Sequence, residues 1–363
     1  MQQPTYDEQI TMKNEMKLRE LCAGLPAFCK EFFRGIEPTT SSRTRIAYAY
    51  DLRVFFHFLI DENPAYRNYS VLDFKVSDLD KIESVDLEEY MEYLKVYISE
   101  EQHKHMQNTE QGVFRKMSAL RSFYGYFYKR QLIEKNPTLL VDMPKIREKE
   151  IIRLEADEVA SLLDFVEHGG DHLTGQKRAY YEKTKERDLA IITLLLGTGI
   201  RVSELVGLNI DDVDFRNNGL HLIRKGRKEM TVYFGNEVAD ALEQYIESSR
   251  KLIIPKEGHE DALFYSMQKT KNWCAGGPES CEKICEGSHS TKKITPHKLR
   301  STYGTALYQE TDDIYLVAEV LGHSDVNTTR KHYAAMSDTR RRQAAGKVVL
   351  RESASHDVDG QKH

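Results

Sequence analysis

Four separated segments of the sequence carry side chains of the kinds that act on a phosphate group. They are residues 198–205 with Arg201 and Glu204, residues 224–228 with Lys225, residues 296–300 with His297 and Arg300, and residues 321–333 with His323 and Tyr333. A guanidinium is a charged fork that fits phosphate oxygens, imidazole and ammonium groups transfer protons, and a phenol can become a covalent nucleophile. Cleaving a phosphodiester without a metal needs this set: a nucleophile, charge stabilisation and a proton for the leaving oxygen.

In this order, the four segments resemble the active-site motifs of the tyrosine recombinases, the family of phage integrases and of the Xer chromosome-resolving enzymes. Upstream, the run Leu-Arg-Ser-Phe-Tyr-Gly-Tyr-Phe at 120–127, Asn136-Pro137 and Pro144-Lys145 resemble the end of that family's core-binding domain. The resemblance therefore covers most of the chain, from about residue 40 to residue 345. It implies a site-specific DNA recombinase, or integrase, that cuts and rejoins DNA through a 3′-phosphotyrosyl intermediate without metal or ATP.

The resemblance also implies a role for each matched side chain. Tyr333 corresponds to the nucleophile, and Arg201 and Arg300 correspond to the arginines that clamp the scissile phosphate. Lys225 corresponds to the lysine that protonates the leaving 5′ oxygen, and Glu204 to a carboxylate that orients the site. His297 and His323 correspond to the histidines that bond the phosphate and assist proton transfer. The permanent charge and planar fork of arginine suit the clamping role.

Each motif also has an ordinary structural interpretation when it is taken alone. Arg201 and Glu204 could form a surface ion pair at i,i+3, and Lys225 could be a solvated member of a basic turn. His297 could be a helix N-terminal residue with no catalytic duty, and the glycine before His323 could end a helix. Only the occurrence of all the motifs in the family's order favours the catalytic interpretation.

The assignment of Tyr333, one of 20 tyrosines, depends on its place after the Gly-His323 pair and two consecutive threonines. The interval from His323 to Tyr333 is one residue longer than the commonest Xer-type spacing, and family members vary there. The neighbouring His332 could serve only as a nucleophile of another kind. Tyr333 is therefore the predicted nucleophile.

A cysteine-bearing segment just before the 296–300 motif departs from the family pattern. It contains Cys274, Cys281, Cys285 and His289, which could form a Cys3His zinc site, with the last two at i,i+4. The spacing of six residues between the first two cysteines is not that of a standard zinc knuckle. Reduced thiols on an insertion are the alternative interpretation, and the family's catalysis requires no cofactor.

The hydrophobic periodicity predicts mostly helices around these motifs. Helices are expected at about 40–59, 87–98, 113–132, 154–166, 188–196, 201–205, 237–251, 297–309 and 314–321, with another after 337, and strands at 219–223 and 230–234. The polar residues 1–20 lack periodicity and are expected to fray, and residues 167–185 read as a polar insertion. The predicted fold is mainly α with a small antiparallel sheet.

Composition along the chain suggests two domains and a linker. The predicted divisions are a partly helical N-terminal extension at 1–39, a helical, SAM-like core-binding domain at 40–143, a charged linker at 144–152, an integrase-type catalytic domain at 153–345 and a flexible tail at 346–363. By the resemblance, the two domains would form a C-shaped clamp around DNA.

Charge is strongly segregated although the net charge is only −5. Residues 79–102 hold eight acidic and two basic side chains, whereas residues 115–153 hold ten basic and four acidic ones. Local patches decide whether DNA binds. The side chains predicted to contact DNA are Arg43, Arg115, Lys116, Arg121, Lys145, Arg227 and Lys228.

The remaining composition fits a soluble cytoplasmic protein of 363 residues. Its longest apolar stretch, 189–196, is shorter than the roughly 20 residues that cross a bilayer, so no membrane partner is expected. Five cysteines, an odd number, do not suggest a disulfide framework and suit a reducing compartment.

The resemblance further implies a homotetramer assembled on two double-stranded recombination sites, with an accessory protein or partner recombinase as a further partner. Two alternatives remain open at this stage: a type IB topoisomerase, which uses a similar active site, and a catalytically silent DNA-binding accessory protein. The core-binding domain and the presence of every expected polar side chain favour recombination.

Overall fold

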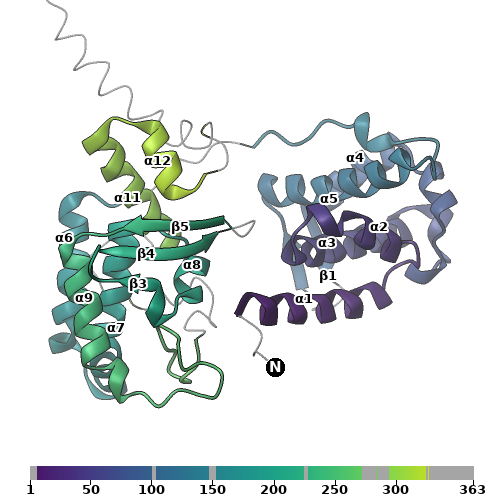
Figure 1. Ribbon diagram of the computed structural model, residues 1–363. Coiled ribbons are helices and arrows are strands. Elements are labelled where there is room, and N and C mark those ends of the chain that lie inside the picture. Colours follow the sequence, from purple (N-terminus) through teal and green to yellow (C-terminus); the bar gives the residue numbers. More distant parts are fainter. Residues whose placement is uncertain are drawn as a thin grey trace, which may run out of the picture. The chain divides into compact units, whose positions relative to one another are not determined.

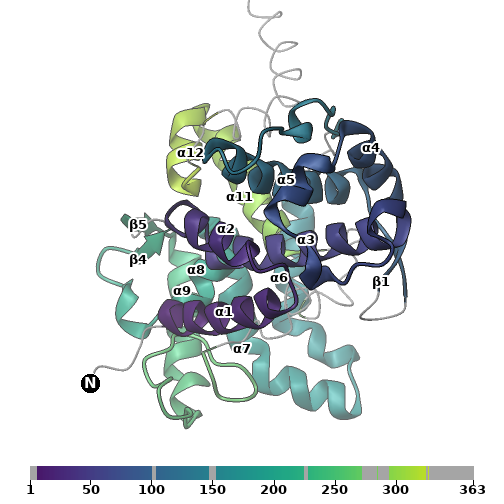
Figure 2. The same cartoon turned by 90° about the vertical axis from the view of Figure 1, so that its right-hand side faces the viewer.

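The computed structural model describes residues 6–99, 104–146, 153–224, 228–271 and 294–323, together with Ile284 and Val326 (Figures 1 and 2). The chain divides into two compact units, Met1–Lys149 and Glu150–His363. Both are mainly helical with a small antiparallel sheet, which confirms the predicted fold class. None of the helices in the described ranges is long and apolar enough to cross a membrane.

The first unit contains five helices and a two-stranded hairpin among its described residues. The elements are α1 (Tyr6–Ala23), α2 (Cys29–Ile36), α3 (Ser42–Glu62), α4 (Ser84–Tyr93), β1 (Val96–Ser99), β2 (Lys104–Gln107) and α5 (Glu110–Lys129), with 3-10 turns at Glu37–Thr39, Pro64–Tyr66, Val71–Asp73, Val76–Lys81 and Pro137–Leu139. The α3 helix starts as predicted from a Ser/Thr cap, because the Ser41 side chain accepts a hydrogen bond from the backbone N–H of Thr44.

An aromatic cluster holds the first unit together. The ring of Phe123 from α5 lies 5.1–6.2 Å, centroid to centroid, from the rings of Phe28, Phe32, Phe56 and Phe127. Aromatic pairs at these separations add stability beyond their burial. The cluster joins α2, α3 and α5, so residues far apart in the sequence fix one another.

The N-terminal segment is a correction to the prediction of a fraying extension. Helix α1 packs along α3, and Leu18, Leu21 and Cys22 near its C-terminal end are buried in the same core as the α3 residues. Polar contacts hold the remainder, because Arg45 Nη2 donates to Glu15 Oε1 at 2.6 Å. Only the C-terminal end of α1 contributes apolar side chains to the core, so hydrophobic periodicity does not mark where this helix begins.

The predicted helix at 87–98 is wrong in its second half. Helix α4 ends at Tyr93, and residues 96–99 form β1, which pairs antiparallel with β2 in a register that places Val96 opposite Gln107. Val96, Tyr97 and Ile98 are β-branched or aromatic, the types that favour strands. In the sequence, these apolar residues look like a continuation of the helical pattern that begins at residue 87.

The second unit surrounds a long central helix. Its described elements are α6 (Ala156–His168), α7 (Gly175–Thr198), α8 (Val202–Gly207), β3 (Val213–Asp214), β4 (Gly219–Arg224), β5 (Lys228–Tyr233), α9 (Asn236–Glu247), α11 (Pro296–Thr311) and α12 (Ile314–Leu321), with 3-10 turns at Gly169–His172, Ile210–Asp212 and Arg250–Leu252. Helix α7 packs against α6, α9 and α11, and the strands form an antiparallel sheet in the order β3-β4-β5. The helix expected after residue 337 lies outside the described residues.

The polar insertion predicted at 167–185 is also corrected. Residues from Gly175 onward belong to α7, which continues without interruption to Thr198. The side chains of this helix are buried only from Thr184 onward, so its first half faces solvent and its second half crosses the core. A change from exposed to buried within one helix looks like a break in the sequence.

Candidate active site

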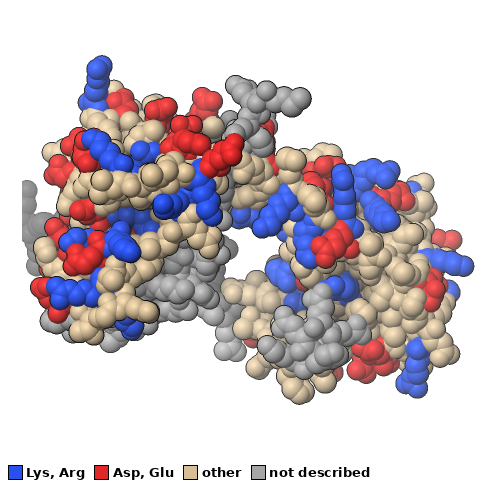
Figure 3. Space-filling model, turned by 90° about the horizontal axis from the view of Figure 1, so that it is seen from below, with Lys and Arg blue, Asp and Glu red and all other residues tan. Residues whose placement is uncertain are grey.

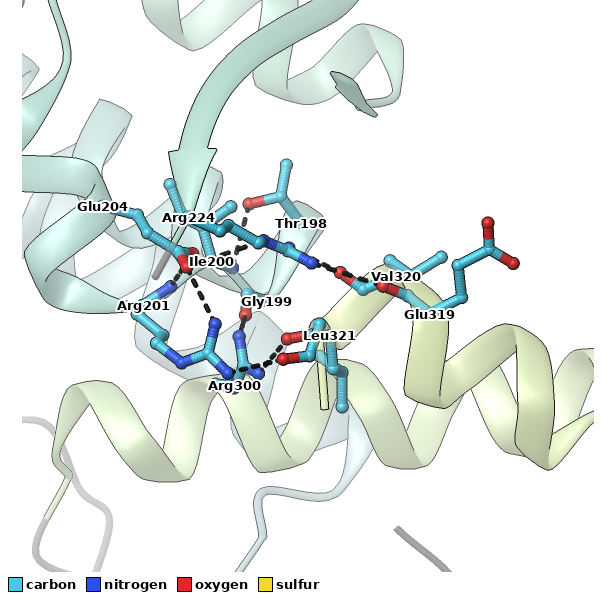
Figure 4. Close-up of polar contacts among 11 residues, drawn as sticks. Thr198, Gly199, Ile200, Arg201, Glu204, Arg224, Arg300, Glu319, Val320 and Leu321 are labelled. Carbon is cyan, nitrogen blue, oxygen red and sulfur yellow. Dashed lines mark hydrogen bonds and ion pairs between the residues drawn. The ribbon is translucent and has the colours of Figure 1, made fainter. Parts of the chain in front are cut away.

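Arg201, Glu204 and Arg300 lie together where α7 and α12 end and α8 begins (Figure 4). Arg201 precedes α8, just after α7 ends at Thr198, while Arg300 lies on α11. His323 follows the end of α12 at Leu321. The four segments named from the sequence therefore meet in one region of the second unit wherever they are described, the last of them through the carbonyl oxygens of Leu321 and Gly322.

Glu204 organises the position of Arg201. One carboxylate oxygen, Oε2, accepts the backbone N–H of Arg201 at 2.8 Å, and the other, Oε1, accepts Arg201 Nη1 at 2.8 Å. The first bond caps α8, because the N–H groups at a helix start have no partner within the helix. The Glu204 side chain is 7% exposed and that of Arg201 is 39% exposed. The i,i+3 pair exists, yet it holds an arginine that still faces solvent.

Arg300 is buried and joins the C-terminal ends of two helices, α7 and α12. Its Nη1 donates to the carbonyl oxygen of Gly199 at 2.5 Å, and its Nη2 donates to the carbonyl oxygen of Leu321. These carbonyls lie at the C-terminal ends of α7 and α12, where helices leave acceptors unsatisfied and favour a cation. Arg201 Nη2 donates similarly to the Gly322 carbonyl oxygen at 2.9 Å. The two arginines thus bind the same end of α12.

Two glycines allow this close approach. Gly199 and Gly322 both adopt left-handed backbone conformations, with φ of +61° and +62°, immediately after α7 and α12. Glycine adopts this conformation without steric cost and commonly ends helices. The structural interpretation of the Gly-His323 pair as a helix end is therefore confirmed, and the same turn delivers His323 to the site.

Replacing Gly199 with alanine should destabilise the second unit. A Cβ at this position would lie 2.4 Å from Cδ1 of Tyr303. Strain in the left-handed conformation together with overpacking should lower the free energy of unfolding by about 2–4 kcal/mol in denaturant titrations. Gly207→Ala is the matched control, because its Cβ would meet no described heavy atom within 4 Å. Equal losses for the two variants would contradict the packing argument.

The two histidines occupy different surroundings. His297 is exposed at the second position of α11, one helical turn before Arg300, and Pro296 before it starts the helix. His323 is half-buried, and its backbone N–H donates to the carbonyl oxygen of Ala318 at 2.9 Å, which completes the turn after α12.

Arg224 is a site residue that the sequence reasoning missed. Its guanidinium lies within the same cluster, with Nε 3.6 Å from Glu204 Oε1. A signal existed, because alternation along β4 places residue 224 on the same face as Leu220 and Leu222, which are 0% and 3% exposed. Residues 225–228, which follow it, are mostly basic, so in the sequence Arg224 reads as one more solvated basic residue.

The cluster carries excess positive charge. Three guanidinium groups, those of Arg201, Arg224 and Arg300, converge on a region where Glu204 is the one carboxylate paired with them among the described residues (Figure 4). Burial lowers the pKa of Arg224 from its usual value, an effect that Glu204 opposes and Arg201 reinforces. An excess of cations in one cluster favours an anion, and a phosphodiester has the matching charge and shape.

Several predicted site residues lie outside the described residues. They are the nucleophile Tyr333, the hairpin residues Lys225 and Arg227, and the zinc candidates Cys274, Cys281, Cys285 and His289. Lys225 and Arg227 lie in the sequence between β4 and β5, whose last register pair is Arg224 with Lys228. Among the described residues, no group of three or more histidine, cysteine or acidic side chains could hold a metal ion.

Two side chains predicted to contact DNA, Arg115 and Lys116, also take part in an internal network, and the Arg115 side chain is 49% exposed. Lys116 is only 8% exposed and donates to Asn108 Oδ1 at 3.1 Å. Arg115 binds the buried Asp51 through two hydrogen bonds of 2.5 and 2.7 Å. Burial raises the pKa of Asp51 and lowers that of Lys116, while the neighbouring opposite charges act in the other direction. The basic residues of α5 include some that pair with a buried carboxylate and some that are exposed, and the sequence pattern does not distinguish the two kinds.

Arg121 is likewise engaged inside the first unit, because its guanidinium donates to the carbonyl oxygens of Thr138 and Val141. The other described candidates, Arg43, Lys145 and Lys228, are exposed. Figure 3 shows lysine and arginine side chains mixed with acidic ones on the visible face of each unit. Exposed basic side chains are therefore present despite the negative total charge.

Comparisons with known proteins agree with this geometry. A sequence model of the phage integrase family matches residues 152–340, just over half of the chain. The tyrosine recombinase XerC of Caldanaerobacter subterraneus subsp. tengcongensis is 35% identical over 322 residues, which cover 85% of this chain and 82% of the relative. The chain belongs to the phage integrase family. It is a tyrosine recombinase of the Xer type. The tyrosine recombinase XerD of Oceanobacillus iheyensis, a second relative, is 29% identical over 82% of this chain and 89% of the relative.

Solved structures show the same fold for the recombinase. The site-specific recombinase XerH, in a post-cleavage complex with a palindromic difH substrate, aligns with a TM-score of 0.60 and 19% identity over 96% of this chain and 98% of that chain. The Tn1549 transposon integrase, in complex with circular intermediate DNA, aligns with a TM-score of 0.60 and 22% identity over 87% of this chain and 98% of that chain. The integrase-type fold therefore extends over most of the chain.

Proposed function

We propose that this recombinase cleaves and rejoins double-stranded DNA at specific recombination sites, with Tyr333 as its nucleophile. The observation that carries the proposal is the convergence of Arg201 and Arg300 with Glu204 at the ends of α7 and α12. The cluster has the charge and the fork geometry that a phosphodiester needs, and it lies in a chain of the phage integrase family.

The proposed reaction balances without metal or ATP. The phenolic oxygen of Tyr333 gives up its proton with the assistance of His297 and His323 and attacks phosphorus. The bond from phosphorus to the 5′ oxygen breaks, and Lys225 gives that oxygen a proton. Arg201 and Arg300 stabilise the charge that develops on the non-bridging oxygens. The 3′-phosphotyrosyl bond conserves the energy of the broken bond, so that another 5′-hydroxyl can attack it and release the tyrosine.

The proposal also assigns roles to the remaining side chains. Among the described residues, Arg201 uses two guanidinium N–H groups, those bonded to Glu204 and Gly322, out of the five that an arginine carries. Its exposed edge can therefore donate to a phosphate. His297 and His323 would bond the phosphate and assist proton transfer at the tyrosine, and Glu204 would keep Arg201 oriented.

The proposed assembly is a homotetramer on two DNA sites, because exchanging four strands requires four active sites. Two neighbours in fold, XerH and the Tn1549 integrase, are described in complexes with DNA, which supports DNA as the partner here. A partner recombinase or accessory protein, action in the cytoplasm and a role in a mobile element are further parts of the proposal.

A nicked suicide substrate tests this function. Full-length protein incubated with such DNA should form a covalent adduct that survives denaturation, because loss of the short 5′ fragment prevents religation. A type IB topoisomerase would also relax supercoiled plasmids that lack a recombination site. A silent DNA-binding protein would give no adduct, and that result would overturn the proposal.

A structural zinc ion, held by Cys274, Cys281, Cys285 and His289, is a separate hypothesis. Such an ion would stabilise the segment before α11 and take no part in the chemistry. We expect elemental analysis to find about one zinc per chain, as a closed four-ligand site requires, and chelation to lower the melting temperature. Purified protein without metal, with unchanged melting and full cleavage, would establish the alternative of reduced, unliganded thiols.

A further inference from the structure

Arg224 binds the end of α12 from the hairpin that carries Lys225. It is the last residue of β4, directly before Lys225, and its side chain is only 9% exposed. Its Nη2 donates to the Val320 carbonyl oxygen at 2.7 Å, and its Nη1 donates to the Glu319 carbonyl oxygen at 3.3 Å. These acceptors belong to the last turn of α12, where carbonyls favour a cation. An arginine beside a basic turn is ordinarily solvated, whereas this one is built into the fold.

The turn after α12 is shaped around this guanidinium. A Cβ on Gly322 would lie 2.1 Å from Arg224 Nη1 and 2.7 Å from its Cζ, so any larger residue there would displace the arginine. Gly322 therefore satisfies two demands, a left-handed conformation and a close approach. His323 follows it directly. Arg224 thus contacts the residues that determine where His323 lies.

Arg224 is also linked to Arg201 through Glu204. Glu204 Oε1 accepts Arg201 Nη1 at 2.8 Å and lies 3.6 Å from Arg224 Nε. The buried Nε has no hydrogen-bond partner among the described residues, so this carboxylate supplies its nearest opposite charge. Arg224 therefore lies between β4, the end of α12 and the Glu204–Arg201 pair, and Arg201 keeps its own bonds to Glu204 and Gly322 (Figure 4).

We infer that Arg224 is a positioning residue, which fixes the start of the hairpin turn against α12 so that Lys225 reaches the leaving 5′ oxygen. The inference rests on the proposed function and adds a residue to its proton-transfer step. Arg224 itself touches neither DNA nor the reacting atoms in this account. Its effect passes through the covalently adjacent lysine, for which a misplacement of about 1 Å can cost about 100-fold in rate.

Sulfur substitution separates positioning of the acid from a general structural role. In a suicide substrate whose bridging 5′ oxygen is replaced by sulfur, the bond from phosphorus to sulfur breaks and the thiolate leaves with little need for a proton. Arg224→Gln should cleave the ordinary substrate about 10–100-fold more slowly than the wild type. On the sulfur substrate its rate should return to within a few-fold of the wild type, as should that of Lys225→Ala.

Arg250→Gln is the matched control. Arg250 also donates to backbone carbonyls, those of Ala262 and Leu263, but it contacts neither the hairpin nor α12 in the described contacts. Its loss should affect melting and leave the ratio of the two cleavage rates unchanged. Arg224→Lys, which keeps the charge, provides a second variant for the same comparison if Arg224→Gln folds poorly.

Two results would overturn the inference. One is an equal loss on both substrates for the Arg224 variants, which would make the arginine a structural residue only. The other is a normal rate on the ordinary substrate. Combining Arg224→Gln with Lys225→Ala should give no further loss beyond Lys225→Ala alone, because one residue acts through the other. Absence of any adduct with the wild-type protein would instead contradict the proposed function.

Discussion

Tyr333→Phe should bind DNA with unchanged affinity and form no covalent adduct. The phenolic oxygen is the atom that would bond to phosphorus, and phenylalanine offers no replacement for it. Because only one hydroxyl is removed, the affinity for DNA should change little, whereas formation of the covalent bond should be abolished. Denaturing electrophoresis of the suicide-substrate reaction measures the adduct, and a binding titration of the same DNA measures affinity.

Tyr315→Phe is the matched control for this prediction. Tyr315 lies on α12 and is 71% exposed, so the loss of its hydroxyl should leave cleavage intact. An adduct formed by Tyr333→Phe would remove Tyr333 from its role and direct attention to another nucleophile. Mapping the DNA-linked peptide would then identify that residue, with the adjacent His332 tested first.

The sequence predicts the fold most reliably where burial repeats at a regular period. The α3 and α5 helices in the first unit and the β4–β5 hairpin in the second are predicted because apolar side chains recur at helical or strand spacing. The N-terminal extension is predicted as partly helical, but the packing of α1 is not predicted, because polar contacts such as Arg45 with Glu15 hold much of this helix. The β1–β2 hairpin was missed because its apolar residues number too few to distinguish a strand from a helix end.

The candidate site was predictable as a set of residue types and unpredictable as a network. Motif order indicates Arg201, Glu204 and Arg300. It does not indicate that Arg300 bonds the carbonyls of Gly199 and Leu321, because these partners lie 101 and 21 residues from it in the sequence. The same limit applied to the charges of α5. Lys116 is consumed by a buried pair with Asp51, and only tertiary packing determines which cations remain on the surface.

Arg201→Lys and Arg300→Lys should each lower the cleavage rate by about 10²–10³-fold, the loss typical of removing one preorganised donor from a developing oxyanion. Lysine keeps the charge but loses the planar fork that binds two oxygens together. DNA affinity should change little, because many other contacts to phosphates contribute to binding. Single-turnover cleavage under saturating protein separates the rate from the affinity.

The structure further predicts that the two substitutions differ in stability. Arg300 is 6% exposed and satisfies two helix-end carbonyls, so Arg300→Lys should also lower the free energy of unfolding by about 1–3 kcal/mol. Arg201 is 39% exposed, and a lysine there can still pair with Glu204, so its variant should melt near the wild-type temperature. Arg250→Lys, which disturbs carbonyl contacts away from the site, should lose stability without the rate loss. Loss of DNA affinity equal to the loss of rate for Arg201→Lys would make that arginine a binding residue, because a clamp on the transition state must act on the rate beyond its effect on binding.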